Sequence, residues 1–196
     1  MGRKNTNILI CGVGGQGVVL ASAILADLAL RKGYDVKQGV VKGMAQRGGS
    51  VVSNLRFGEK VYSPLIPKGE VDFLFSTEKL ETLRWIEWCS PKTLIIADSL
   101  EIYPPAVNRG EAEYPKDIEE FLRSNFERVY LLPATEIAKN LGDPRIANVV
   151  LLGALSNFLE FEESLWEESI MENVPKRALE INLMAFREGK KLIQEI

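Results

Sequence analysis

A glycine-rich segment close to the amino end has the composition of a phosphate-binding loop. Residues 12–17 have the sequence GVGGQG, follow a short apolar run and precede a segment rich in alanine and leucine. Between a strand and a helix, such a loop offers backbone N–H groups and the positive end of the helix dipole to an anion. A strand-to-helix turn without a ligand explains the spacing equally well, so both interpretations stay open. The candidate cofactor-binding residues of this segment are Gly12, Gly14, Gly15, Gln16 and Gly17.

A second glycine-containing segment follows the next predicted strand and is expected to lie beside the first. Residues 42–50 have the sequence KGMAQRGGS. Its arginine offers a planar cationic fork, its glutamine and serine offer neutral hydrogen bonds, and its paired glycines let backbone amides approach a ligand or another chain. A loop with a solvated arginine is the alternative. The candidate binding residues of this segment are Gln46, Arg47, Gly48, Gly49 and Ser50.

The two segments fit a nicotinamide dehydrogenase poorly. Such enzymes place Asp or Glu at the end of the second strand, about 20 residues beyond the loop, to hold the ribose hydroxyls. Here Gln38 and Gly39 occupy that region, and Asp35 precedes the strand. The missing acid weakens this interpretation. The alternative function is a free-standing Rossmann-type enzyme using NAD or FAD, or a nucleotide-binding module, and only the glycine loop supports it.

The histidine and cysteine content excludes several kinds of chemistry within this chain. There is no histidine, which excludes His-based metal sites, a Ser-His-Asp relay and imidazole acid–base catalysis. The two cysteines, Cys11 and Cys89, are too few for an iron–sulfur cluster, which needs about four thiolates. We expect both thiols to pack as small apolar side chains. We accordingly assign no catalytic and no metal-binding residue to this chain.

The rest of the sequence alternates strand and helix patterns around these segments. This alternation predicts an α/β fold, a three-layer Rossmann-like sandwich whose mostly parallel sheet carries a hairpin addition, in one domain of residues 1–196. The expected strands are residues 7–11, 36–40, 51–57, 61–62, 71–75, 93–97 and 129–132. The expected helices are residues 18–30, 78–88, 118–125, 135–141, 147–159 and 176–196. Residues 58–60, GEK, predict the hairpin turn between the third and fourth of these strands.

Two surface features leave more than one interpretation open. Leu179, Leu183 and Phe186 form an apolar stripe at helical spacing, which either packs on the core or forms a partner interface. Residues 160–168 are strongly acidic and form either a solvated face or a docking site for a basic partner.

The overall composition argues against nucleic-acid and membrane partners. The net charge of −3 and a pI near 5.3 do not match the basic excess of nucleic-acid-binding proteins. The longest apolar stretches, residues 18–30 and 146–159, fall short of the ~20 residues that span a bilayer. The first residues do not resemble a signal peptide, so we expect a cytoplasmic protein.

Along nearly its whole length the chain resembles the gamma-type subunits of the 2-oxoacid:ferredoxin oxidoreductases. The resemblance rests on residues 12–17 and on the segments 43–51 (GMAQRGGSV), 61–67 (VYSPLIP), 148–154 (NVVLLGA) and 182–189 (NLMAFREG). Pyruvate and 2-oxoglutarate relatives have proline-glutamate before the Arg-Gly-Gly, where this chain has Met44, Ala45 and Gln46. The chain is therefore most similar to the small (beta) subunits of the arylpyruvate, or indolepyruvate, branch. Lys42 departs from that branch, where a histidine is expected.

The resemblance implies a function that this chain performs only with a partner. It implies oxidative decarboxylation of an aryl 2-oxoacid to the aryl-acetyl coenzyme A and carbon dioxide, with electrons passed to ferredoxin through the large subunit of a heteromer. It places thiamine diphosphate and the iron–sulfur clusters on that large subunit and leaves coenzyme A as the candidate ligand of the glycine segments. The small subunit would then position reactants and exclude water, while the cofactors supply the difficult chemistry.

A substitution at Arg47 tests whether the second glycine segment holds a phosphate of coenzyme A. If its guanidinium binds that phosphate, Arg47→Ala should raise the KM for coenzyme A several-fold in the assembled enzyme. Steady-state kinetics measure this change. An unchanged KM, rate and assembly would remove Arg47 from the site.

Overall fold

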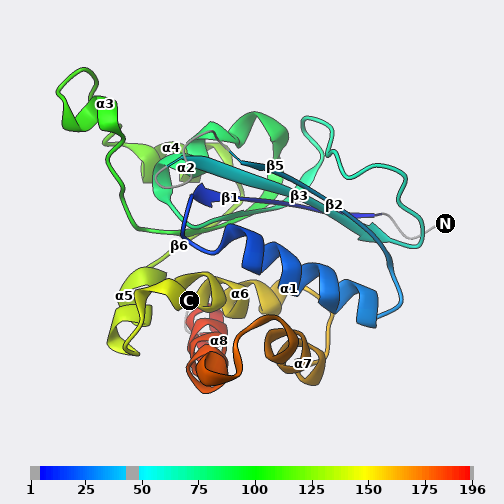
Figure 1. The fold of residues 1–196 in the computed structure, drawn as a ribbon. Coiled ribbons are helices and arrows are strands. Elements are labelled where there is room, and N and C mark those ends of the chain that lie inside the picture. The colour runs from blue at the N-terminus through cyan, green and yellow to red at the C-terminus, as the bar shows by residue number, and fades with distance from the viewer. Residues whose placement is uncertain (1–4, 43–48, 195–196) are drawn as a thin grey trace.

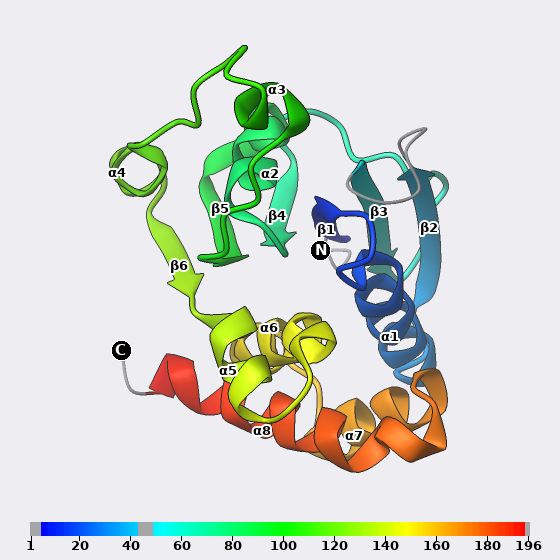
Figure 2. The same ribbon diagram turned by 60° about the vertical axis from the view of Figure 1, so that its left-hand side comes forward.

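Six strands form one mixed sheet in the computed structural model, which describes residues 5–42 and 49–194. Figure 1 shows the sheet nearly edge-on, and Figure 2 shows the strand order, which is β2-β3-β1-β4-β5-β6. Strands β1, β4, β5 and β6 are parallel to one another, and β3 is antiparallel to both of its neighbours, β1 and β2. The strands are β1 Thr6–Val13, β2 Asp35–Lys42, β3 Ser50–Gly58, β4 Val71–Ser76, β5 Cys89–Asp98 and β6 Arg128–Leu132.

Strand β1 lies inside the sheet, between β3 and β4, and its apolar sequence reflects burial on both faces. Ile8 and Ile10 belong to one hydrophobic core, whereas Leu9 and Cys11 belong to the other. Because side chains alternate across a strand, one continuous apolar run supplies both cores.

Helices cover both faces of the sheet, and one face carries a second helical layer. Helices α2 and α4 pack on one face, while α1, α5 and α6 pack on the other, with α7 and α8 outside them (Figures 1 and 2). The helices are α1 Val18–Arg31, α2 Lys79–Arg84, α3 Pro105–Asn108, α4 Ile118–Asn125, α5 Ala134–Asn140, α6 Ala147–Leu155, α7 Glu163–Asn173 and α8 Leu179–Gln194. Short 3-10 turns occupy Ile86–Trp88, Pro144–Ile146, Ser156–Phe158 and Lys176–Ala178.

Helix α6 is buried along its entire length, because it lies between the sheet and α8. Two glycines allow α6 and α8 to approach at backbone distance. A Cβ at Gly153 would overlap the carbonyl oxygen of Phe186, and a Cβ at Gly189 would overlap that of Val150. The 148–154 and 182–189 segments of the sequence therefore form one tightly packed helix pair.

The α/β sandwich with a mostly parallel sheet is confirmed, but the predicted hairpin is wrong. Residues 61–62 form no strand, and the antiparallel strand is β3 itself, paired with β1 and β2. Two prolines, Pro64 and Pro67, follow and cannot donate to a strand ladder. Side chains hold this segment instead: Arg56 donates to the carbonyl oxygens of Ser63 at 3.2 Å and Leu65 at 3.0 Å.

The carboxyl-terminal third contains a helix that its composition did not predict. The acidic segment continues into α7, whose Trp166 and Ile170 are fully buried in the core. Its carboxylates pair within the chain, Glu163 with Lys190 and Glu167 with Arg187. In α8, Phe186 is buried and the rest of the predicted stripe packs partly against the same core, which confirms the core interpretation.

The helix predicted at residues 78–88 ends earlier, at Arg84.

The α6–α8 packing makes Gly189 sensitive to a single methyl group. In a solvated helix, Gly→Ala stabilises by up to about 1 kcal/mol. Here we expect Gly189→Ala to lower the free energy of unfolding by about 1–3 kcal/mol, because the new Cβ would overlap backbone. Urea denaturation measures the change. Met184→Ala, at an exposed position of α8, serves as the control, and a more stable Gly189→Ala protein would contradict the close approach.

Candidate functional site

The carboxyl ends of β1 and β4 bring the glycine loop beside the connection that follows β4. Residues 14–17 join β1 to α1, and residues 77–78 join β4 to α2. Helices α1 and α2 leave these adjacent strands on opposite faces of the sheet. The point where connections diverge in this way is where open α/β sheets bind their ligands. The predicted loop therefore lies at the topological switch point of the fold.

Glycine is required in this loop for both conformation and space. Gly15 and Gly17 have positive φ values of 102° and 78°, which other residues rarely adopt. A Cβ at Gly17 would lie 2.5 Å from the amide nitrogen of Asn148, and one at Gly12 would overlap the hydroxyl of Thr77. These contacts explain the glycine spacing without a ligand, and they also bring the loop backbone close to the ends of β4 and α6.

The Gln16 side chain turns inward and fixes the loop. Its Oε1 accepts from the Val13 N–H at 2.7 Å and from the Thr77 hydroxyl at 2.9 Å, and its Nε2 donates to the Thr77 carbonyl at 3.0 Å. The carboxamide, predicted to bind a cofactor, is thus hydrogen-bonded to protein at both ends. We assign it the role of positioning the loop.

The amino end of α1 is the part of the loop best suited to an anion. Within the described residues, no side chain caps this end and its first turn carries no acidic residue. A depression of about 350 Å³ lies against it, lined by Val13, Gly14, Gly15, Gly17, Val18, Val19 and Val51. The first turn of α1 therefore adds no negative charge of its own to the positive end of the helix dipole, which favours a phosphate there.

The second glycine segment meets the first where the structure describes it. The Gly49 carbonyl accepts from the Gly14 N–H at 2.8 Å, and the Ser50 hydroxyl donates to Glu81 Oε2 at 2.5 Å. This confirms, for Gly49 and Ser50, the prediction that the two segments lie side by side. Gln46, Arg47 and Gly48 lie outside the described residues.

Two buried glutamates beside the loop were missed from the sequence. Glu78 and Glu81 are 1% and 5% exposed. Glu78 accepts from the N–H groups of Glu81 at 2.7 Å and Ile102 at 3.0 Å, and from the Tyr114 hydroxyl at 3.1 Å. Burial raises the pKa of Glu78 above its usual range, although these hydrogen bonds oppose the shift. The sequence offered one signal that could have found these glutamates: both follow shortly after the apolar run of residues 71–75.

Asp98, at the end of β5, is a third buried acid at this edge. Its Oδ2 accepts from the Thr135 N–H at 3.0 Å and from the Thr135 hydroxyl at 2.5 Å, and its Oδ1 accepts from the Leu100 N–H at 3.2 Å. Burial raises the pKa of this carboxyl. Asp98 thus links the connection after β5, at Leu100, to the connection after β6, at Thr135. We therefore assign it a structural role.

The described residues offer no reactive thiolate and no metal site. Burial raises the pKa of the Cys11 thiol far above its usual range and that of Cys89 to about 12, so both are neutral near pH 7. Cys11 is fully buried, as expected, whereas Cys89 is half-buried. Among residues 5–42 and 49–194, no three His, Cys, Asp or Glu side chains are grouped to hold a metal ion.

In the same ranges no helix is long and apolar enough to cross a membrane.

The described residues form a Rossmann-like sheet with a glycine loop at its switch point, the class of fold that the comparisons with known proteins also find. Residues 7–192 match the family described as pyruvate ferredoxin/flavodoxin oxidoreductase. The chain belongs to this family, which confirms the predicted resemblance and favours it over a free-standing NAD or FAD enzyme.

Several curated relatives match the chain from end to end. The indolepyruvate oxidoreductase subunit IorB of Thermococcus kodakarensis is 37% identical, and the match covers 98% of each chain. The protein of the same name from Archaeoglobus fulgidus is 38% identical over 93% of this chain and 92% of its own length. The 2-oxoglutarate synthase subunit KorC of Methanothermobacter thermautotrophicus is 31% identical over 96% of this chain and 95% of its own.

Solved structures with the same fold include isolated subunits and a larger enzyme. The gamma subunit of a keto/oxoacid ferredoxin oxidoreductase from Geobacter sulfurreducens has a TM-score of 0.73 at 22% identity, covering 97% of this chain and 99% of that one. A 2-oxoglutarate:ferredoxin oxidoreductase from Magnetococcus marinus, with 2-oxoglutarate, coenzyme A and succinyl-CoA bound, has a TM-score of 0.76 at 22% identity. That match covers 99% of this chain and 32% of the larger one.

The buried Glu78 carboxyl should give stability a measurable pH dependence. Its folded pKa lies above the unfolded value of 4.5, so its stabilising contribution is fully present below pH 4.5 and is lost as the pH rises through the folded pKa. We therefore expect Glu78→Gln to become more stable relative to the wild type as the pH rises from 4.5 to neutral. Urea denaturation across this range measures the difference.

A partly exposed aspartate with the opposite shift is the control for this measurement. The Arg145 guanidinium lowers the pKa of Asp143 to about 2, so the contribution of this ion pair is present above pH 3.8 and is lost only as the pH falls toward 2. Asp143→Asn should therefore differ from the wild type by a constant amount between pH 4.5 and neutral. A constant difference for Glu78→Gln as well would contradict its raised pKa.

Proposed function

We propose that this chain is the small subunit of an arylpyruvate (indolepyruvate) ferredoxin oxidoreductase. The observation that carries the proposal is a comparison within one organism. The chain is 37% identical to subunit IorB of Methanothermobacter thermautotrophicus but 31% identical to subunit KorC. Met44, Ala45 and Gln46, where pyruvate and 2-oxoglutarate relatives have proline-glutamate, support the same branch.

The proposed enzyme converts an aryl 2-oxoacid and coenzyme A to the aryl-acetyl thioester and carbon dioxide. Electrons released by the decarboxylation pass to ferredoxin. Thiamine diphosphate would supply the electron sink that the decarboxylation needs, and iron–sulfur clusters would carry the two electrons of the oxidation. The family resemblance places both on a large partner subunit, and for the iron–sulfur clusters this agrees with the two cysteines of this chain, which are too few to ligate one. We propose a cytoplasmic heteromer that meets ferredoxin through the large subunit.

Coenzyme A is the ligand that fits the residues of this chain. Its phosphates match the uncapped amino end of α1 and the depression that the glycine loop forms there. Backbone amides of Gly15, Gly17 and Val18 are the candidate donors, and Arg47 is the candidate side chain. The Magnetococcus enzyme, of which one part shares this fold, has coenzyme A bound.

The role of this chain is then positional. Gln16 and Thr77 hold the glycine loop in one conformation, so the amides are arranged before the ligand arrives. A phosphate fixed at the loop limits where the thiol end of coenzyme A can reach, and the body of the subunit excludes water on that side. Neither step needs a titrating group from this chain.

Reconstitution with the large subunit tests the proposal. The purified chain is mixed with the large subunit from the same organism, and reduction of ferredoxin is followed with indolepyruvate, pyruvate and 2-oxoglutarate as substrates. Activity that requires both subunits and coenzyme A, and that is greatest with indolepyruvate, supports the proposal. Greater activity with pyruvate or 2-oxoglutarate, or full activity of the isolated chain, would overturn it.

A charge placed at the start of α1 should weaken coenzyme A binding selectively. Val19 is 41% exposed in the first turn and lines the depression. We expect Val19→Glu to raise the KM for coenzyme A several-fold by repelling its phosphate, while the negative charge favours the helix itself. Steady-state kinetics of the assembled enzyme measure this. Val19→Gln, of similar size and neutral, is the control, and equal KM values for the two variants would contradict a phosphate at this position.

A further inference from the structure

Exposed apolar side chains gather at one edge of the sheet, along β2. This strand is the outermost on its side (Figure 2), and no strand of the described residues pairs with its outer side. Ten large apolar side chains are exposed in the described residues, and four of them are Val40, Val41, Tyr62 and Leu65. Tyr62 and Leu65 are 88% and 66% exposed. Single exposed apolar residues are ordinary, whereas a cluster of them marks a surface that contacts another molecule.

Three of these four side chains belong to one face of the sheet. Residues 61–67 cross this face, because a Cβ at Gly39 would lie 3.4 Å from the Pro64 ring. Val41 is two residues beyond Gly39 on the same strand and therefore points to the same face. The three side chains, called the β2 surface below, are those of Val41, Tyr62 and Leu65.

The sequence around the β2 surface is basic although the chain as a whole is acidic. Residues 31–68 contain eight Lys or Arg and two Asp or Glu, whereas the rest of the chain contains 16 and 25. Within the described residues, Lys37 and Lys60 share one acid, Asp35, at 2.5 and 3.6 Å. In the same part of the chain the Arg56 guanidinium donates only to neutral amide and carbonyl oxygens. The surroundings of the β2 surface thus carry a net positive charge.

The β2 surface lies close to the glycine loop. Strands β1 and β2 are both antiparallel to β3, so their carboxyl ends lie at the same edge of the sheet. Val41 pairs with Val52, and Val52 pairs with Cys11, the residue before Gly12. Two strand spacings, about 10 Å, therefore separate Val41 from the start of the loop. A partner seated on the β2 surface borders the loop that we propose for coenzyme A.

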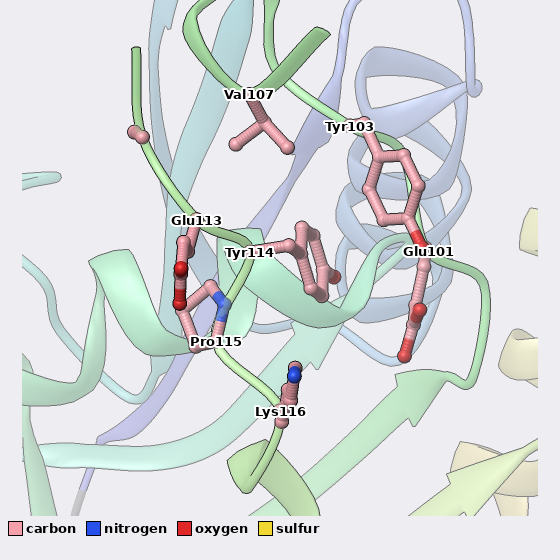
Figure 3. Close-up of a pocket in the computed structure, with 8 residues that line it drawn as sticks. Glu101, Tyr103, Val107, Glu113, Tyr114, Pro115 and Lys116 are labelled. Atoms are coloured by element: carbon pink, nitrogen blue, oxygen red, sulfur yellow. The ribbon is translucent and has the colours of Figure 1, made fainter. Parts of the chain in front are cut away.

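An arm formed by residues 99–117, between β5 and α4, lacks this combination of features (Figure 1). It carries a depression of about 470 Å³ that is lined by side chains of both signs, among them Glu113 and Lys116 (Figure 3). Tyr103 is 52% exposed, but its ring packs on Tyr114, with the centroids 5.0 Å apart. The arm offers neither a cluster of exposed apolar side chains nor a single sign of charge.

We propose that the β2 surface docks the large subunit, which meets it with apolar side chains inside an acidic rim, an inference that rests on the proposed function. The thiol of coenzyme A has to reach the thiamine cofactor of the large subunit, so the two subunits have to meet within reach of the glycine loop. The positive surroundings orient an acidic partner, while Tyr62 and Leu65 supply contact area that loses water in the complex. A second copy of this chain would bring like charges face to face, which disfavours self-association there.

The affinity of this chain for the large subunit tests the docking site. Isothermal titration calorimetry measures the Kd between the purified large subunit and each form of this chain. We expect Leu65→Asp and Tyr62→Ala to raise the Kd on the order of tenfold or more. Met171→Asp, at a 53% exposed position of α7, is the matched control and should leave the Kd unchanged. Because the Leu65 side chain is exposed, urea denaturation of Leu65→Asp should match that of the wild type.

The charge of the substituting residue separates the apolar contribution from the electrostatic one. Leu65→Lys removes the same apolar contact but adds a positive charge, so it should weaken binding less than Leu65→Asp does. The Kd of the wild type should rise with salt concentration, because ions screen the attraction between the two surfaces. At saturating concentrations of either Leu65 variant, the assembled enzyme should keep the wild-type KM for coenzyme A.

Each part of the proposal has an outcome that contradicts it. Equal Kd values for Leu65→Asp and Met171→Asp would overturn the docking site, and equal values for Leu65→Asp and Leu65→Lys would overturn the acidic character of the partner. Loss of affinity in Tyr103→Ala alone would place the docking site on the arm. A homodimer of the isolated chain that Leu65→Asp dissociates would assign the β2 surface to a second copy. A wild-type chain that does not bind the large subunit would instead contradict the proposed function.

Discussion

The contact between Gln16 and Thr77 controls the geometry on which the site depends. The glycine loop can lie against the end of β4 because Gly12 leaves room for the Thr77 hydroxyl and because Gln16 supplies both a donor and acceptors to that junction. The positive φ of Gly15 and Gly17 then turns the chain into α1 without strain. The backbone amides at the start of α1 and the residues after β4 are consequently held on adjacent strands, at the edge where their helices leave in opposite directions.

This geometry gives the edge two chemically different halves. One half has a helix start whose first turn carries no acidic residue. The other has two buried glutamates held by Ser50, Arg84, Tyr114 and backbone N–H groups. The first is suited to phosphate and the second to hydrogen-bond donors. No thiolate, imidazole or metal site occurs among the described residues of this edge.

The packing behind the sheet keeps that edge rigid. Helix α6 begins beside the loop, where Asn148 donates to the Gly17 carbonyl at 3.2 Å, and it is then buried between the sheet and α8. The close approach of α6 and α8 at Gly153 and Gly189 leaves little freedom for movement. Family segments far apart in sequence, residues 12–17, 148–154 and 182–189, are thus parts of one continuous packing arrangement.

The sequence by itself determined the α/β alternation, the positions of most strands and helices, the strand–loop–helix context of residues 12–17 and the absence of imidazole chemistry. These properties follow from local periodicity, from glycine and from composition, which need no knowledge of distant contacts. It did not determine helix α7, because the buried Trp166 and Ile170 are separated by glutamates that dominate the composition. Only the tertiary structure decided that Gln16 turns inward, that β3 is antiparallel and that Glu78 and Glu81 converge with Ser50. Each depends on the register of strands that meet after long connections, and Gln16 and Thr77 are 61 residues apart in the chain.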